Sequence, residues 1–308
     1  MTTATQHHNP DAVIDPDAVV GHPKRPFKRY FRETGWRHLV GIAMSIFAAF
    51  PLLYVFSASL NPGGTLVTAN SLFSNFSFQS YVDLFNRPQQ PYAAWFGNTL
   101  LIGGISSLGT VFLGALAAYA FSRMRFIGRR VGLLTLLLVQ MFPQLLAVVA
   151  IFLLLSGISE IFPAIGLNSQ IGLIMVYLGG ALGVNTYLMY GFFNTVPSSI
   201  DEAAKIDGAG HARIFFTIIL RLVAPILAVV GLLSFVGTTS EFVIASIVLI
   251  DPDKQTLAVG LYQFVSQEFS RNWSIFAAGA VLAAIPVMTL FLFLQKYIVG
   301  GLTAGSVK

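Results

Sequence analysis

The stretch VGLLTLLLVQMFPQLLAVVAIFLLL, residues 131–155, contains no charged side chain. A helix of about 20 apolar residues crosses the roughly 30 Å hydrocarbon core of a bilayer, so this stretch predicts a membrane-spanning segment. Five further runs of this kind occur in the 308-residue chain. They cover residues 38–60, 95–120, 170–193, 223–250 and 273–297. The sequence therefore predicts an all-α integral membrane protein with six transmembrane helices.

The composition supports a membrane protein and excludes several other classes. Hydrophobic residues make up 55% of the chain and charged residues 10%, against about 25% charged in an average soluble domain. The net charge of +5 does not indicate nucleic-acid binding, because the basic residues flank apolar runs. The absence of cysteine excludes disulfides, cysteine metal sites and thiol nucleophiles. We expect no metal, because the only adjacent histidines, His7 and His8, lie in a polar tail.

The distribution of positive charge predicts the orientation. Fifteen of the 18 Lys and Arg residues fall on one side of the predicted spans, and only Arg87, Lys254 and Arg271 fall on the other. Cytoplasmic loops retain Lys and Arg, so both termini are expected in the cytoplasm. Residues 1–37 then form a partly disordered cytoplasmic tail. A cleaved signal peptide is not expected, because the basic cluster lies too far from the start of the chain.

The loop at residues 194–222 is expected to be cytoplasmic and folded. Ser199 and Glu202 have the spacing of a capping box, which predicts the start of a short helix. Gly208 and Gly210 should end that helix, because glycine adopts backbone angles that other residues avoid. A second helix is expected from His211. Its predicted apolar face is Ile214, Phe215, Ile218 and Leu222, and its polar face is Arg213, Thr217 and Arg221.

The same loop resembles the EAA loop of binding-protein-dependent ABC importer permeases. The match consists of Glu202-Ala203-Ala204, Gly208, Ile218 and Leu220 at the family's spacing. The family has a proline after the last of these positions, where this chain has Arg221, but Pro225 follows closely. The alternative interpretation is an amphipathic helix that only lies on the bilayer.

The resemblance implies a type I ABC importer fold, with a permease core of spans 2–6 at residues 92–298 and a peripheral first span at residues 38–60. It implies that the loop couples the permease to an ATPase. The residues carried over for this role are Glu202, Ala203, Ala204, Asp207, Gly208, Gly210, Ile218 and Leu220. The expected partners are a second permease subunit, two ATPase subunits, an extracytoplasmic solute-binding protein and membrane lipid, in a bacterial-type inner membrane.

Two further stretches resemble the maltose or maltodextrin permease of the smaller kind. They are residues 300–305, after the last span, and residues 256–260, after span 5. The resemblance implies that the C-terminal tail at residues 299–308 contacts the ATPase through Thr303, Ala304 and Gly305. It also implies an external loop that contacts the binding protein. Its residues are Gln267, Glu268, Phe269, Ser270, Arg271 and Asn272.

The chain is not expected to be an enzyme or to hold a cofactor. Gly300 and Gly305 have the outer spacing of a phosphate-binding loop, but Ser306 replaces its lysine. ATP and Mg²⁺ are therefore expected on the partner ATPase. An ion-coupled secondary transporter is the alternative from another class, and it would typically show internal repeats and charged midplane sites. An importer of the same class for a different solute also stays open.

The candidate translocation-pathway residues are Glu241, Ser240, Asn185 and Tyr187. Glu241 is the only acidic residue clearly inside a predicted span, and such residues usually face a bundle interior or a wet pathway. A structural hydrogen-bonding role for Glu241 is the alternative. Gly179 and Gly183 form a G-x-x-x-G pair, which predicts close helix packing.

Overall fold

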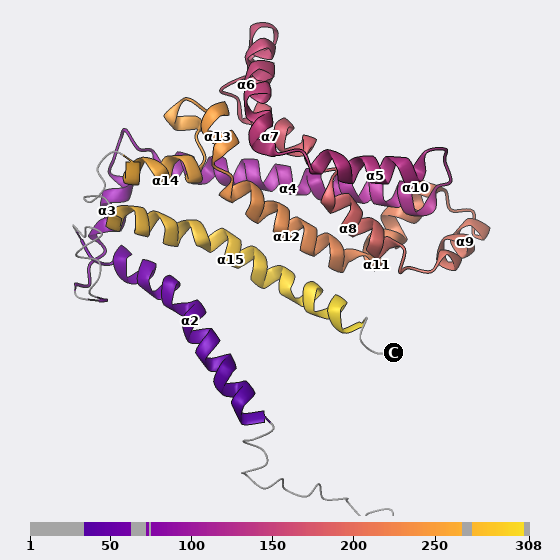
Figure 1. Cartoon of the computed structure of the whole chain (residues 1–308), viewed down its shortest axis with the longest axis horizontal. Helices are drawn as coiled ribbons and strands as arrows, with labels where there is room; N and C mark the ends of the chain where they lie inside the picture. The colour runs from indigo at the N-terminus through magenta and orange to yellow at the C-terminus, as the bar shows by residue number, and fades with distance from the viewer. Residues whose placement is uncertain (1–33, 63–71, 74, 267–272, 305–308) are drawn as a thin grey trace, which may run out of the picture. The chain divides into compact units, whose positions relative to one another are not determined.

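The computed structural model describes residues 34–62, 72–73, 75–266 and 273–304, and every regular element in these ranges is helical (Figure 1). Contacts divide the chain into two units, residues 1–52 and residues 53–308. The helices are α2 (Trp36–Ser59), α3 (Gln79–Phe85), α4 (Tyr92–Arg123), α5 (Arg129–Gln140), α6 (Gln144–Ile161), η3 (Pro163–Ile165), α7 (Gln170–Gly179), α8 (Val184–Phe193), α9 (Ser198–Ile206), α10 (His211–Arg213), η4 (Ile214–Ile219), α11 (Leu220–Leu222), α12 (Ala224–Ser240), α13 (Val243–Val248), η5 (Pro252–Lys254), α14 (Leu257–Ser266) and α15 (Trp273–Ala304).

The described residues offer up to six membrane spans, as the sequence predicts. Three helices, α2, α4 and α15, are each long and apolar enough to cross a bilayer. The other three candidates are bent pairs. The bends are 96° between α5 and α6, 53° between α7 and α8, and 79° between residues 211–222 and α12. The last candidate span, Trp273–Ile298, agrees with the prediction, and the helix α15 that contains it continues to Ala304.

The predicted span over residues 131–155 is not one straight helix, because that stretch breaks between α5 and α6. Pro143 lies in the break, with a φ of −62° and a ψ of 115°, and precedes the first residue of α6. Proline lacks an amide proton and disfavours helical angles in the residue before it. The stretch at residues 223–250 also breaks, because Glu241 has a ψ of 123° and ends α12.

The predicted G-x-x-x-G packing face is also wrong. Gly179 is the last residue of α7 and Gly183 precedes α8, so the two glycines lie on opposite sides of a break. A Cβ atom on Gly179 would meet nothing within 4 Å, whereas one on Gly183 would collide with the side chain of Gln140. The Nε2 atom of Gln140 donates to the carbonyl of Gly180 at 3.1 Å. Gly183 therefore makes room for the Gln140 side chain, which satisfies a carbonyl of the broken backbone.

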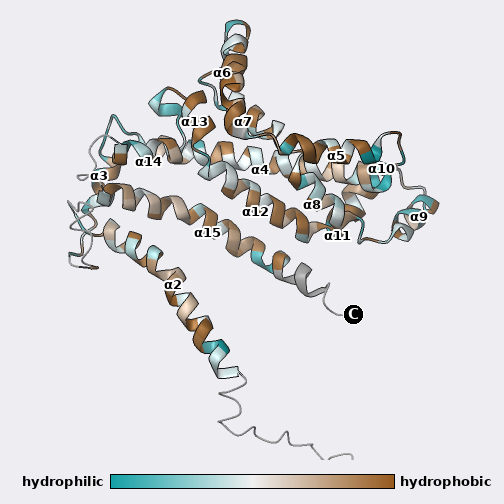
Figure 2. Ribbon diagram, viewed as in Figure 1, coloured by the Kyte–Doolittle hydropathy of each residue, from teal (hydrophilic) through white to brown (hydrophobic). Residues whose placement is uncertain are grey.

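The core of the second unit is organised around α4, which packs against α7, α8, α12 and α14. Its buried face is made largely of small residues, which allow close approach of neighbouring helices. They include Thr99, Gly103, Ser106, Ser107, Thr110, Gly114, Ala115 and Ala118. Figure 2 shows hydrophobic residues along α12 and α15 and hydrophilic residues gathered at α10. Apolar side chains such as Leu108, 72% exposed, and Phe293, 70% exposed, face outward and suit lipid or another subunit.

The loops at one end of these helices are tied together by Asn168, which has a positive φ of 59°. Its Oδ1 atom accepts from the amides of Ile250 and Asp251 at 3.1 and 3.0 Å, and its Nδ2 atom donates to Asp251 Oδ2 at 2.6 Å. The hydrogen bond from Asn168 lowers the pKa of the Asp251 carboxyl below its ordinary range. A hydrogen bond from Lys254 lowers it further. A depressed pKa adds stability that is lost only as pH falls through the folded value, so the tie is intact at neutral pH.

Trp95 fixes the same end of the core. Its side chain is fully buried, its Nε1 atom donates to the carbonyl of Pro252 at 2.8 Å, and its ring lies 6.1 Å from that of Phe264. Gly260 on α14 packs closely against this indole, and a Cβ atom there would collide with the ring. Gly260 belongs to the stretch at residues 256–260 that resembles the maltose permease, and it is required there for packing within this chain.

We predict that Gly260→Ala destabilises the protein by about 1–3 kcal/mol, because the added methyl overpacks the site beside Trp95. Gly237→Ala is the matched control. Gly237 lies in α12 with open space around a Cβ atom, so alanine there should be neutral or slightly stabilising. Unfolding of the purified chain in mild detergent measures both. Equal stability of the two variants would contradict the packing argument.

Candidate functional site

The C-terminal end of α9 has the geometry that its glycines predict. Gly208 has a φ of 78°, in the left-handed region that favours glycine. Its amide donates to the carbonyl of Lys205 at 3.0 Å, and the amide of Ala209 donates to that of Ala204 at 2.9 Å. These two bonds form a Schellman motif, which satisfies carbonyls that the helix end leaves open. The turn at Gly208 is therefore fixed by backbone chemistry.

The N-terminal end of α9 differs from the prediction. A capping box requires Ser199 as the N-cap, but α9 already begins at Ser198 and its N-cap is Pro197. No side chain makes a capping hydrogen bond there. Pro197 has an extended ψ of 135°, so the helical backbone begins only at the next residue. Glu202 is consequently free of any capping role and is exposed.

The two faces of α9 have different environments. The outward face, defined by Ser199, Glu202, Ala203 and Ile206, is exposed and follows helical spacing. Ile206 is 87% exposed, an unusual position for a large apolar side chain on a short polar helix. Asp207 and the two glycines after it are exposed as well. This face is therefore available to another molecule.

The inward face of α9 is held to the end of α4 by an ion pair. Nε of Arg123 lies 2.8 Å from Oδ2 of Asp201, and the two side chains are only 11% and 8% exposed. The contact is ionic rather than an aligned hydrogen bond, because these atoms make no bond of good geometry. Nη2 of Arg123 also donates to the carbonyl of Val196 at 2.7 Å. One arginine thus joins a membrane-spanning helix to α9 and to the turn before it.

The hydrophobic side of the loop packs into a core with α4, α8 and α12. Ala204 is 7% exposed and joins this cluster, and Ile218 and Leu220 pack against it. These three of the predicted coupling residues therefore support the loop from inside. Glu202, Ala203, Asp207, Gly208 and Gly210 are the members of that set that lie on the exposed side.

The second predicted helix begins at His211, but residues 214–219 form a π-helical stretch, η4. Its wider turn rotates the residues that follow relative to a regular α-helix. Ile214 and Phe215 are buried as predicted, and Ile219 is fully buried. Leu222 is 45% exposed, so the predicted apolar face is buried only in part. The chain then turns by 79° into α12, with Pro225 in the first turn of that helix.

Glu241 holds the break between α12 and α13. Its carboxylate accepts from the hydroxyl of Tyr177 at 2.8 Å and from the amides of Ile244 and Ala245 at 2.8 and 2.9 Å. Such a carboxylate satisfies amides that a broken span exposes. The structure therefore gives Glu241 a hydrogen-bonding role in the fold.

Glu241 also lines a cavity of about 330 Å³ between α4, α7 and α12. Asn185 lines the same cavity. Its other lining residues with polar side chains are Thr110, Tyr177, Ser234 and Thr238. Ser240 lines a different cavity, near Thr99 and Thr239. Tyr187 is 48% exposed and its ring lies 6.4 Å from that of Tyr190, so it does not line the Glu241 cavity.

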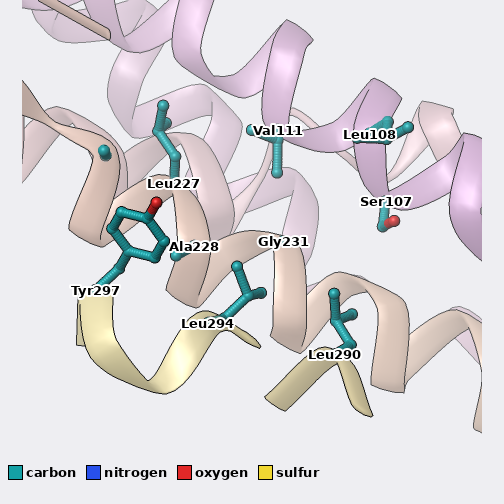
Figure 3. Close-up of a pocket in the computed structure, with 10 residues that line it drawn as sticks. Ser107, Leu108, Val111, Leu227, Ala228, Gly231, Leu290, Leu294 and Tyr297 are labelled. Atoms are coloured by element: carbon teal, nitrogen blue, oxygen red, sulfur yellow. The ribbon is translucent and has the colours of Figure 1, made fainter. Parts of the chain in front are cut away.

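A third cavity, of about 380 Å³, is almost entirely apolar (Figure 3). Helices α4, α12 and α15 surround it, and Ser107 and Tyr297 carry its only side-chain hydroxyls. Small polar solutes need convergent hydrogen-bonding groups, which this cavity lacks. The cavity at Glu241 has them.

Two predicted contact regions lie at the limits of the described chain. The proposed binding-protein loop, residues 267–272, lies outside the described residues. Thr303 and Ala304 belong to α15, and Gly305 lies outside the described residues.

The model of the family of binding-protein-dependent transport system inner membrane components matches residues 110–303. This chain belongs to that family. It is an ABC importer permease, and the finding favours this function over an ion-coupled secondary transporter. The chain is 40% identical over 282 residues to the galactooligosaccharide transport system permease protein GanQ of Bacillus subtilis, covering 91% of this chain and 97% of GanQ. It is 39% identical to the maltose/maltodextrin permease MalG of Escherichia coli, covering 88% and 94%.

Solved structures show the same fold. The permease matches a chain from a bacterial ABC transporter involved in import of the acidic polysaccharide alginate, with a TM-score of 0.72 and 23% identity. The match covers 87% of this chain and 98% of the other. A second alginate transporter structure, solved with a periplasmic protein bound to an alginate pentasaccharide, matches with a TM-score of 0.62 and 17% identity. These likenesses confirm the predicted all-α, multi-span importer fold.

Sequence reasoning missed three residues at this site. The pairing of Arg123 with Asp201 joins segments 78 residues apart, so no local sequence pattern indicates it. A sequence signal exists for Ile206, because it is a lone large apolar residue among Glu202, Lys205 and Asp207.

We predict that Asp201→Asn destabilises the permease by about 3 kcal/mol, because it leaves the buried guanidinium of Arg123 without its counter-charge. The double variant Arg123→Met with Asp201→Leu should lose less unfolding free energy than the two single variants lose together. It removes both charges and leaves neither one buried alone. Denaturation by titration with sodium dodecyl sulfate gives the free energies. Strictly additive losses would show that the two residues are not coupled.

We predict that Gly208→Ala lowers the stability of the permease by about 1–2 kcal/mol, because alanine disfavours the left-handed backbone at this position. The added Cβ atom would meet nothing within 4 Å, so no steric clash contributes. Gly210→Ala is the control, since its φ of −73° and ψ of 164° suit alanine. Hydrogen exchange across residues 198–213 should rise only in the Gly208 variant. Similar exchange in both variants would contradict the Schellman assignment.

Proposed function

We propose that this permease imports a sugar of the maltodextrin type across a bacterial inner membrane. It acts with a second permease subunit, two ATPase subunits that bind ATP and Mg²⁺, and an extracytoplasmic binding protein. Residues 92–298 form the transporting core, residues 38–60 a peripheral span, and both termini face the cytoplasm. ATPase closure moves α9, and the spans alternate between outward-facing and inward-facing states.

The observation that carries this proposal is the pairing of an exposed outward face on α9 with a buried ion pair on its inward face. A docking element must be open to its partner and also fixed to the part that it moves. The outward face supplies small and polar residues around Ile206, which suits insertion into a cleft. The pair of Arg123 and Asp201 connects α9 directly to α4. Both requirements are therefore supported by this chain's own residues.

The choice of a sugar is supported by two observations. Curated relatives at about 40% identity are named as galactooligosaccharide and maltose/maltodextrin permeases. The cavity at Glu241 carries hydroxyl, amide and carboxylate groups, which suit the many hydroxyls of a sugar. Its chemistry does not favour one oligosaccharide over another, because these groups bind hydroxyls in general.

Uptake by the purified importer in proteoliposomes, with its binding protein, tests the substrate class. We expect ATP-dependent accumulation of one or more maltodextrins, galactooligosaccharides or related oligosaccharides, and none of amino acids. Isothermal titration of the binding protein against the same sugars identifies the solute. Uptake by this chain alone, driven by an ion gradient, would overturn the proposal.

The adjacent alanines of α9 provide a matched test of docking. Ala203 is on the exposed face and Ala204 on the buried one. We predict that Ala203→Leu leaves stability unchanged but lowers ATPase co-purification at least tenfold, because the side chain obstructs a close contact. Ala204→Leu should instead destabilise the permease by about 1–3 kcal/mol by overpacking the core. Normal ATPase binding by the Ala203 variant would exclude this face as the docking surface.

A further inference from the structure

A cavity of about 460 Å³ opens beside α9, at the end of α4 that carries Arg123. It is lined by side chains from α4, the turn after it, α5, α9 and α10, so residues far apart in the chain converge on it. Its lining is predominantly polar, unlike the apolar cavity of Figure 3. The lining residues are Tyr119, Ser122, Arg123, Arg125, Arg129, Ser198, Asp201, Glu202, Lys205 and His211.

The cavity has an excess of positive charge. Four of its side chains are Arg or Lys and two are carboxylates, with His211 in addition. Arg123 is committed to Asp201, and Arg129 donates to the hydroxyl of Tyr190 at 3.3 Å. Within the described part of the chain, Arg125 has no ion pair or hydrogen bond to its guanidinium, and neither has the ammonium of Lys205. Unbalanced cations that converge on a concave site favour an anionic ligand.

The turn between α4 and α5 locates this cavity at a membrane surface. Ile127 is fully exposed, and Phe126 beside it is 46% exposed, although both are strongly apolar. Basic residues at 123, 125, 129 and 130 flank them on both sides. Apolar side chains that enter lipid next to Arg residues at headgroup level are typical of an interfacial anchor. The exposed apolar pair beside these Arg residues therefore suits a position near lipid phosphates.

Phosphate is the anion that best fits these groups. Guanidinium groups donate two parallel hydrogen bonds to phosphate oxygens, and Arg125 and Arg129 approach the cavity from opposite ends of the same turn. Basic pockets between spanning helices at the cytoplasmic surface bind the headgroups of anionic lipids. A free phosphate has the same chemistry but would gain nothing from the exposed Phe126 and Ile127.

We propose that this cavity, here named the basic cavity, binds a phosphate group, supplied by an anionic phospholipid whose acyl chains lie beside Phe126 and Ile127. Arg125 and Arg129 hold the phosphate, and Lys205 of α9 contributes a third cation. Because Lys205 belongs to α9, the bound headgroup links the orientation of α9 to the lipid surface. The site does not depend on which solute the importer carries.

The test compares lipid retention by the full-length permease in nanodiscs of equal parts phosphatidylglycerol and phosphatidylcholine. Native mass spectrometry counts the lipids that stay bound after release from the disc. We expect the wild type to retain phosphatidylglycerol preferentially. Arg125→Gln with Arg129→Gln should reduce this preference about tenfold, since each cation near the surface contributes roughly fivefold before screening. Arg130→Gln is the matched control, because Arg130 is adjacent and equally charged but does not line the basic cavity.

Arg125→Gln alone keeps the test decisive if the double variant folds poorly, and it should reduce the preference about threefold. A second arm titrates inorganic phosphate into lipid-free permease in detergent and follows ³¹P line broadening. Broadening that depends on Arg125, without lipid preference, would support the phosphate site and identify free phosphate as its source. Equal lipid retention by the double and Arg130 variants, with no broadening, would overturn the proposal. Reduced ATPase co-purification with unchanged lipid and phosphate binding would overturn it too, because the basic cavity would then be a protein contact.

Discussion

Hydrocarbon offers no hydrogen bonds to a polypeptide backbone, and this constraint governs the interior of the permease. Three predicted spans are interrupted, and each interruption exposes amides or carbonyls that need partners. Gln140, at the end of α5, donates to the carbonyl of Gly180 in the break of the next span. Glu241 accepts from the two amides at the start of α13 and from Tyr177 of α7. Gln140 and Glu241 thus place their polar side chains where the backbone is broken.

These same breaks create the cavity that a polar solute could use. A continuous helix directs its backbone polar groups inward along its own axis, so a bundle of unbroken helices offers only side chains to a ligand. Breaks at Gly180 and Glu241 open space between α7 and α12 and bring a carboxylate, an amide and several hydroxyls to one wall. Glu241 contributes to the fold and to the cavity wall together, so its two interpretations are compatible.

The loop at residues 194–222 has a different requirement, which is to be exposed and rigid at once. The Schellman turn at Gly208 fixes one end of α9, and the buried pair of Arg123 and Asp201 fixes its inward face. Removing either partner of a buried ion pair leaves an uncompensated charge, so α9 resists separation from α4. A rigid connection of this kind transmits displacement, whereas a flexible loop would absorb it. The proposed lipid phosphate in the neighbouring basic cavity would contact the same helix through Lys205.

The sequence by itself determined the class of this protein, up to six candidate membrane spans, and the short helices of the loop at residues 194–222. These follow from local properties: apolar run length, the left-handed preference of Gly208, and spacing within one segment. Only the tertiary structure decided the 96° bend beside Pro143, the end of α12 at Glu241, and the exposure of Leu222 after the π-helical stretch, because these depend on packing against other helices. It alone paired Arg123 with Asp201 and gathered the basic cavity, since contacts between distant segments leave no periodicity in the chain that forms them.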